Sequence, residues 1–269
     1  MATITISFDG KSYSKQVETL INGKSEFSAK VGFSAYKTVA EKKKFDKKNK
    51  IITVRNSKFY IPNYKEDLIQ GCLYNSYEYF EENYLIKTDT YLPKNPTIID
   101  IGANIGNHTL YWANEVHAKK IYSFEPVKKI FNILKKNIEI NNLDKKVVLY
   151  NMAVSDENTK GAIESFDKQN MGGTRLKISD NKRKNTIPFV TLDSINFTDK
   201  KIDLIKIDVE GMDYLVLTGA IKTIQKYKPV ILMESFPTEY NISSRILKAL
   251  GYKIECKVGS FEYIYLYDK

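Results

Sequence analysis

Apolar and polar residues follow a regular order over the second half of the chain. From Thr97 onward, short and almost continuously apolar runs alternate with longer segments in which apolar residues recur with helical spacing. The runs predict buried strands, and the longer segments predict amphipathic helices. The predicted strands are 97–101, 120–124, 147–150, 203–208 and 230–235, and the predicted helices are 106–116, 127–141, 213–226 and 238–250. This order indicates an α/β fold, a mostly parallel sheet with helices on both faces.

The carboxyl end of the chain departs from this order. Residues 252–257 and 262–267 are two further strand-like runs, and the short segment between them contains Gly259 and no helical pattern. Two strands joined by so short a turn pair antiparallel. We therefore expect an antiparallel pair to close the sheet.

The first 90 residues carry a weaker pattern. Short β-rich runs at 51–55 and 58–61 predict a hairpin, and 64–73 and 76–87 have helical apolar spacing. The prolines in 88–96 indicate a connector. We therefore predict an N-terminal accessory region over 1–90 and a main domain over 91–269.

Composition narrows the class of protein. The chain has 269 residues, of which 42% are hydrophobic and 28% are charged, as in ordinary soluble globular proteins and unlike disordered or fibrous ones. No apolar run has the length of a membrane span, and the first residues lack the pattern of a signal peptide. Cys72 and Cys256 lie far apart without metal-ligand spacing, so we expect reduced thiols and a cytoplasmic location.

The net charge of +10 is concentrated at the front of the chain. Residues 1–60 carry 13 Lys and Arg against 5 Asp and Glu, and the densest run is 41–50. Such a run would attract RNA or another anion, or it would form a solvated surface. The chain contains four arginines, so the planar groups that suit phosphate recognition are scarce. We favour the solvated surface.

The segment 97–113 carries the most specific chemistry. An apolar strand containing Asp100 is followed by a turn with Gly102 and Gly106, which leads into a helix. Glycine permits a tight bend and a close approach of a ligand at the carboxyl end of a strand, where open α/β sheets bind ligands. About twenty residues later the next strand ends at Glu125, where a carboxylate would accept hydrogen bonds from ribose hydroxyls.

The spacing of the glycines argues against a dinucleotide. Dinucleotide sites use G-x-G-x-x-G, and here Asn104 stands where the second glycine would approach the pyrophosphate. A nucleoside without phosphates fits better, and S-adenosylmethionine is one. The alternative is a glycine turn that packs a helix against a strand and binds nothing.

Four segments, taken in order, resemble the FkbM family of S-adenosylmethionine-dependent methyltransferases. They are Asp100-x-Gly102-Ala103-Asn104-x-Gly106, Phe124-Glu125-Pro126, Thr191-Leu192-Asp193 and Ile205-Lys206-Ile207-Asp208-Val209-Glu210-Gly211. The resemblance covers about residues 97–235. It implies the class I methyltransferase (Rossmann-like) fold, a seven-stranded, mostly parallel sheet with helices on both faces and an antiparallel last strand. It also implies O-methylation of a sugar or another small hydroxylated molecule.

The resemblance further implies a set of cofactor contacts. Gly102, Asn104 and Gly106 would lie under the methionine part of the cofactor, Asp100 would order that loop or contact the amino group, and Glu125 would hold the ribose. The resemblance also offers three more candidates by position: Met152 and Ala153 beside the adenine, and Glu81, which lies 19 residues before Asp100. The alternative for Glu81 is an exposed helix glutamate.

A hydroxyl acceptor must lose its proton during methyl transfer, so a general base is expected at strand ends facing the cofactor. Candidates are Asp208 and Glu210, which follow the fourth strand, Glu234, which ends the fifth, and His108. The alternatives are a helix cap or a contact with the cofactor amine for Asp208, backbone contacts for Glu210 and a packing role for His108. The three carboxylates would suit a divalent ion, but their spacing does not require one, and we predict no metal.

Two segments would shape the acceptor site. The stretch 167–188 contains Gly172, Gly173 and Arg175, which suit either a loop over the acceptor or a surface excursion. The tyrosines of the N-terminal region would line a sugar site or form a packing layer (Tyr60, Tyr64, Tyr74, Tyr77 and Tyr79).

The leading hypothesis is an S-adenosylmethionine-dependent methyltransferase that acts on a sugar or glycan-precursor hydroxyl, with a small-molecule or glycan partner. Two alternatives stay open. One is an RNA methyltransferase that uses the basic N-terminal segment, and the other is a non-catalytic nucleoside-binding module.

Overall fold

The computed structural model describes residues 2–8, 11–17, 45–179 and 186–268. The chain divides into two compact units, residues 1–37 and 38–269. In the first unit, β1 (Ala2–Phe8) pairs antiparallel with β2 (Lys11–Val17). Part of the predicted basic run, 41–44, lies outside the described residues. These two units do not test the predicted division into an accessory region over 1–90 and a main domain over 91–269, which is a division by function.

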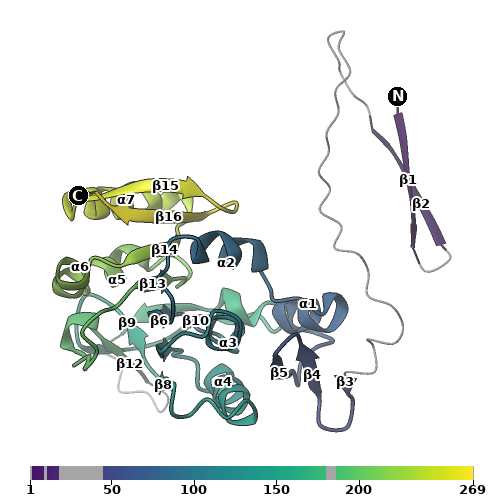
Figure 1. Cartoon of the computed structure of the whole chain (residues 1–269), viewed down its shortest axis with the longest axis horizontal. Helices are drawn as coiled ribbons and strands as arrows, with labels where there is room; N and C mark the ends of the chain where they lie inside the picture. Colours follow the sequence, from purple (N-terminus) through teal and green to yellow (C-terminus); the bar gives the residue numbers. More distant parts are fainter. Residues whose placement is uncertain (1, 9–10, 18–44, 180–185, 269) are drawn as a thin grey trace. The chain divides into compact units, whose positions relative to one another are not determined.

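A seven-stranded sheet forms the centre of the second unit (Figure 1). Its order is β15-β16-β14-β13-β6-β7-β8. The strands are β6 (Thr97–Ile101), β7 (Lys120–Phe124), β8 (Val147–Tyr150), β13 (Leu204–Ile207), β14 (Val230–Glu234), β15 (Tyr252–Lys257) and β16 (Glu262–Tyr267). The first five run parallel, and β16 pairs antiparallel with both β14 and β15. The predicted class I methyltransferase sheet, with its antiparallel end, is confirmed.

Helices cover both faces of this sheet, and the alternation of side chains along each strand explains how. In β6, Ile98 packs into one core cluster with α3 (Asn107–Asn114) and α4 (Lys128–Ile140). Its neighbour Ile99 packs into a second cluster with α5 (Asp213–Thr218), α6 (Ile221–Tyr227) and α7 (Pro237–Ala249). Because successive side chains of a strand point to opposite faces, continuously apolar strands create two cores.

The predicted hairpin near residue 56 is confirmed. β3 (Phe45–Asp46), β4 (Ile51–Val54) and β5 (Ser57–Tyr60) form a small antiparallel sheet. Its buried residues, including Ile52 and Phe59, belong to the same core cluster as α3 and α4. The hairpin is therefore part of the main core of residues 38–269.

Two predicted helices differ in their extent. α1 (Leu68–Ser76) begins four residues later than predicted. It starts after Asp67, whose side chain caps the helix by accepting a hydrogen bond from the backbone N–H of Gln70. α2 (Glu82–Asp89) begins six residues later than predicted. Tyr77 and Glu81 both adopt left-handed backbone conformations, which interrupt a helix between them.

The helix predicted over 213–226 is divided into α5 and α6. Gly219 lies between them, where an added Cβ would stand 1.9 Å from the backbone oxygen of Ser155. The chain therefore bends at a point of close backbone contact, which an apolar pattern does not reveal.

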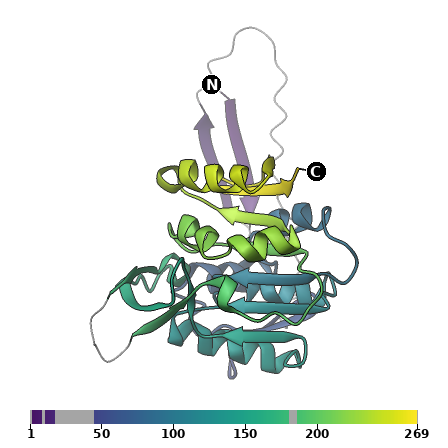
Figure 2. The ribbon, with the colours of Figure 1, turned by 90° about the vertical axis from the view of Figure 1, so that its left-hand side faces the viewer.

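A second small sheet lies partly within the stretch 167–188, which was predicted as a loop over the acceptor or a surface excursion. β9 (Ala153–Val154), β10 (Thr159–Ser165), β11 (Arg175–Ile178) and β12 (Ile187–Val190) pair in the order β11-β10-β12-β9. Figure 2 shows these teal to green strands projecting from one side of the central sheet. A single turn of 3-10 helix, Met171–Gly173, lies before β11. None of the helices in the described residues is long and apolar enough to cross a membrane.

Candidate active site

The glycine loop between β6 and α3 has the conformation that its sequence predicts. Gly102, Asn104 and Gly106 all have positive φ, at 80°, 49° and 91°. A Cβ on Gly102 would lie 1.8 Å from the backbone oxygen of Asp208, so the loop passes directly against the end of β13. Glycine is required here for both its φ and its small size.

A cleft of about 260 Å³ opens beside this loop, at the carboxyl ends of β6, β7, β13 and β14. Most of the predicted site residues line it: Glu81, Gly102, Asn104, His108, Glu125, Met152, Ala153, Asp208 and Glu210. Asp100 and Gly106 do not line the cleft and lie behind its wall. The topology therefore brings together residues that are up to 129 positions apart in the chain.

Asp100 contributes to the site through a buried lysine. Its Oδ2 accepts a hydrogen bond from Thr109 at 2.5 Å, and its Oδ1 lies 3.5 Å from Nζ of Lys206. Lys206 also donates to the backbone oxygen of Gly102 at 2.8 Å and lies 3.0 Å from Oδ2 of Asp208. Of the two roles considered for Asp100, the geometry favours ordering of the glycine loop.

Lys206 is a site residue that sequence reasoning missed. Burial alone would lower its pKa, but Asp208 and Asp100 raise the pKa above its ordinary value, so the ammonium stays charged. The available signal was a lysine between two isoleucines in an otherwise apolar strand. A charge buried in a strand needs a partner, and that requirement points to the carboxylates around it.

Glu125 presents a carboxylate that the backbone already orients. Its Oε2 accepts from the N–H of Asn104 at 3.0 Å, and its Oε1 accepts from the N–H of Val127 at 2.8 Å. Burial raises its pKa to about 7, although these hydrogen bonds and the Lys206 charge act in the opposite direction. Each oxygen retains a second lone pair, so the carboxylate can accept from two ligand hydroxyls.

Three carboxylates form the acidic end of the cleft. One oxygen from each of Asp208, Glu210 and Glu234 lies within 4.8 Å of the others, close enough to share one cation. Burial would raise the pKa of Asp208, but the neighbouring Lys206 ammonium holds it below its usual value. Burial and the charge of Asp208 raise the pKa of Glu210 to about 7 and that of Glu234 to about 10. The three groups therefore differ in protonation near pH 7.

Glu81 and His108 face each other at the same end. Oε2 of Glu81 lies 3.4 Å from Nε2 of His108, and both side chains border the cleft. His108 is buried and packs beside the ring of Trp112, with centroids 5.7 Å apart. Glu81 precedes α2 in a left-handed conformation, so the interpretation as an exposed helix glutamate is wrong.

The opposite end of the cleft is apolar. Met152 and Ala153 lie there with Val127, Ile130 and Leu176, a lining that suits an adenine ring. Met171, Gly172 and Thr174 also line the cleft, and they belong to the stretch 167–188 that was considered as a loop over the acceptor. Leu68 and Ile69 on α1 line it as well and were not identified from the sequence, because α1 and the cleft come together only in the fold.

The N-terminal tyrosines form a packing layer. Tyr64 and Tyr74 pack edge-on or tilted against each other and Phe45, while Tyr79 is buried against Phe59 and Tyr111. None of the five tyrosines considered lines the cleft within the part of the chain that the structure describes. Arg175 is exposed on β11 and also does not line the cleft.

Comparison with known proteins identifies similar chains. The model of the methyltransferase FkbM domain matches residues 100–254. "Methyltransferase sdnD" of Sordaria araneosa is 27% identical over 162 residues, which cover 48% of this chain and 61% of that protein. "Methyltransferase 1" of Beauveria bassiana is 28% identical over 149 residues, covering 47% and 59%. The chain thus spans about three fifths of the length of these curated relatives.

Solved structures show weaker similarity. A methyltransferase FkbM from Methylobacillus flagellatus is 16% identical with a TM-score of 0.47, covering 65% of this chain and 44% of that one. TYW2 of M. jannaschii, solved in complex with AdoMet, is 14% identical with a TM-score of 0.43, covering 80% of this chain and 82% of that one.

Proposed function

Because the chain belongs to the FkbM family of methyltransferases, we propose that it transfers a methyl group from S-adenosylmethionine to a hydroxyl of a sugar or glycan precursor. The observation that carries the proposal is the cleft itself. It joins a carboxylate oriented for a ribose, Glu125, to an acidic end suited to a hydroxylated acceptor.

The cleft fits the cofactor at both ends. Gly102 lets the loop pack directly against the backbone of Asp208, where a Cβ would collide, and this contact fixes the loop as one wall of the cleft. Glu125 accepts from ribose hydroxyls, and the apolar lining near Met152 covers the adenine. When bound, S-adenosylmethionine supplies a methyl group on a sulfonium, which is already activated for displacement.

The chain's own residues position the acceptor and remove its proton. We assign the role of general base to Glu210, whose pKa of about 7 keeps a useful fraction of the carboxylate ionised at neutral pH. The acceptor oxygen forms the new bond to the methyl carbon as the carbon–sulfur bond breaks with its electron pair on sulfur. The hydroxyl proton moves to Glu210. Asp208, fixed by Lys206, orients the acceptor hydroxyl.

The acidic end also bears on the alternatives. Carboxylates accept hydrogen bonds from sugar hydroxyls but repel phosphates, so the cleft favours a neutral acceptor over RNA. The alternative of a non-catalytic module predicts that the protein binds the cofactor without methyl transfer.

Cys72 and Cys256 are free thiols, which supports the cytoplasmic location that we propose. Residues 91–269 bind the cofactor and activate the acceptor, and within the predicted accessory region we assign acceptor recognition to Leu68 and Ile69, which line the cleft, with Glu81 as an exception that contacts the cofactor.

A screen of acceptors tests the proposal directly. Free sugars, nucleotide sugars and structured RNAs are incubated with the protein and S-adenosylmethionine, and products are examined by mass spectrometry for the gain of one methyl group. Methylation of a sugar compound is expected. Methylation of RNA alone would replace the proposal with the RNA alternative, and binding without any product would support the non-catalytic module.

The ribose assignment gives a separate prediction. We expect Glu125→Ala to weaken S-adenosylmethionine binding by about 10- to 100-fold, because a charged acceptor of two hydrogen bonds is lost. Isothermal titration calorimetry measures the change. Glu139→Ala, an exposed position on α4, serves as the control and should leave the affinity unchanged. Unchanged affinity in Glu125→Ala would remove the ribose assignment.

A further inference from the structure

We propose that Asn107 is a positioning residue that holds Glu81 at the end of the cleft where the methionine part of the cofactor lies. The inference rests on the proposed function. It assigns a specific task to a side chain that neither the glycine loop nor the acidic end includes.

Asn107 clamps the backbone just before Glu81. Its Oδ1 accepts from the N–H of Phe80 at 3.0 Å, and its Nδ2 donates to the carbonyl oxygen of Phe80 at 2.8 Å. Both polar groups of one residue's backbone are thus satisfied by one buried side-chain amide. Asn107 is the first residue of α3, directly after Gly106, so the clamp ties the glycine loop to the segment before α2.

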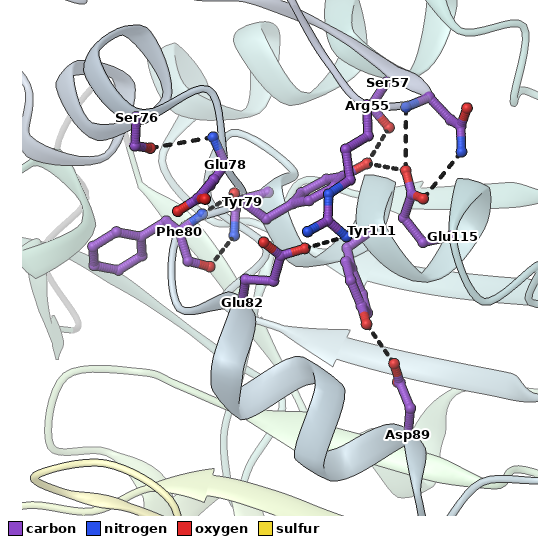
Figure 3. A network of polar contacts seen from close by, with 12 residues as sticks. Arg55, Ser57, Ser76, Glu78, Tyr79, Phe80, Glu82, Asp89, Tyr111 and Glu115 are labelled. Carbon is purple, nitrogen blue, oxygen red and sulfur yellow. Dashed lines mark hydrogen bonds and ion pairs between the residues drawn. The ribbon is translucent and has the colours of Figure 1, made fainter. Parts of the chain in front are cut away.

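The residues on either side of Phe80 and Glu81 are also anchored, as Figure 3 shows. The Tyr79 hydroxyl lies 2.7 Å from Oγ of Ser57 and donates to Oε1 of Glu115 at 2.9 Å. Arg55 lies 2.6 Å from Oε1 of Glu82. These contacts fix the ends of the segment to the β4–β5 hairpin and α3, while Asn107 fixes its centre.

The conformation of Glu81 explains why such a clamp is needed. Its φ of 60° is unfavourable for a residue with a side chain, costing about 1–3 kcal/mol, and persists when the surroundings impose it. Its own side chain makes no capping bond to α2. Released from the clamp, the backbone would relax toward an ordinary conformation, and the carboxylate would leave its place opposite His108.

At that place the Glu81 carboxylate faces a cleft wall formed by the glycine loop and Asp208. A carboxylate there suits the ammonium group of an amino-acid moiety, which it holds by a charge-assisted hydrogen bond. The adenine and ribose lie at the other end, near Met152 and Glu125. Misplacing Glu81 should therefore weaken binding of the amino-acid part and leave binding of the nucleoside part unchanged.

The fold contains a matched control for this clamp. Asn141, after α4, makes the same pair of bonds to the backbone of Lys58: the N–H of Lys58 donates to its Oδ1 at 2.8 Å, and its Nδ2 donates to the Lys58 oxygen at 2.6 Å. It lies outside the cleft lining. Asn141→Ala removes an equivalent pair of hydrogen bonds, and a third from its Nδ2 to the oxygen of Asn137, without touching the segment before Glu81.

The test compares two ligands by calorimetry in the full chain. For S-adenosylmethionine, we expect Asn107→Ala to weaken binding by about tenfold and Asn141→Ala by no more than about twofold. For 5′-methylthioadenosine, which lacks the amino-acid moiety, both variants should bind like the unchanged protein. Retained binding of this second ligand also shows that the variant pocket is folded.

A double-mutant cycle with Glu81→Gln shows whether Asn107 acts through Glu81. The combined variant should bind S-adenosylmethionine no more weakly than Glu81→Gln alone, because the carboxylate that Asn107 positions is already gone. Fully additive losses, equal losses in the two asparagine variants, or a loss shared by 5′-methylthioadenosine would overturn the proposal. If the unchanged protein fails to bind S-adenosylmethionine, the proposed function itself fails.

Discussion

Gly102→Ala is expected to weaken S-adenosylmethionine binding by at least about 100-fold, the largest binding effect of any substitution considered. The added Cβ would stand 1.8 Å from the oxygen and 2.9 Å from the carbon of the Asp208 backbone. Neither the Gly102 backbone nor the Asp208 backbone can move freely to relieve this clash. The Asp208 N–H donates to the oxygen of Ile101, and the Gly102 oxygen accepts from Lys206. Alanine also disfavours the φ of 80° at this position.

Binding is measured by calorimetry and stability by thermal unfolding. Gly251→Ala is the matched control, because Gly251 has a similar φ of 84° but lies at the turn before β15, where a Cβ would meet the ring of Tyr267 at 3.0 Å. Both variants should be less stable, by about 1–3 kcal/mol from backbone strain alone. Loss of cofactor binding is expected for Gly102→Ala alone. Normal affinity in that variant would show that the loop does not support the cofactor.

The central sheet was predictable because its strands are buried on both faces. A strand such as 97–101, apolar at three of its five positions and buried at all five, has one stable environment, between two layers of helices. The location of the site could then be predicted from the order of strands in the sheet. Once the strand ends are known to share one edge, Gly102, Glu125 and Asp208 must lie near one another.

The parts that were not predicted depend on contacts distant in sequence. Residues 77–81 lie in a run with helical apolar spacing, yet Asn107 and the hairpin hold them in a non-helical conformation. In the sequence, Lys206 is one residue of a predicted strand. Its role in the site follows from its contacts with Asp100 and Asp208 in the fold. β10 and β11 are largely polar and exposed, so they lack the alternation that identifies a strand.

The carboxyl groups at the acidic end differ in pKa, and this difference assigns a separate role to each of them. Asp208 is held ionised by Lys206 at 3.0 Å, and an ionised carboxylate with a low pKa is a weak base. Glu234, with a pKa raised to about 10, keeps its proton near neutral pH and can donate a hydrogen bond. Glu210 lies between these limits, which is why we assign proton removal to it.

Glu210→Gln is accordingly expected to lower kcat by about 10²- to 10⁴-fold, the range that general base catalysis contributes. Glutamine has nearly the same shape but cannot take up the hydroxyl proton. Binding of S-adenosylmethionine should change by no more than about twofold, because the variant leaves Glu125 and the glycine loop intact. The rate is measured with the acceptor that the mass-spectrometric screen identifies, and the affinity is measured by calorimetry.

The pH profile provides a second measurement of the same role. Burial and the charge of Asp208 raise the pKa of Glu210 to about 7, while Arg175 and Lys206 act in the opposite direction, and Glu234 faces it in the protonated form. A base must be deprotonated to act. The rate of the unchanged protein should therefore fall as the pH drops through about 7 and level off above it, and this inflection should be absent from Glu210→Gln.

Glu239→Gln is the control for the substitution, because Glu239 lies on α7 close to Gly211 but outside the cleft lining. It should retain both the rate and the inflection near pH 7. A Glu210→Gln variant that keeps a rate within about threefold of the unchanged protein would exclude Glu210 as the base, since a lost general base costs far more than that. An unaltered inflection in that variant would assign the titration to another group, with Glu125 the next to test because burial also raises its pKa to about 7 and it lines the same cleft.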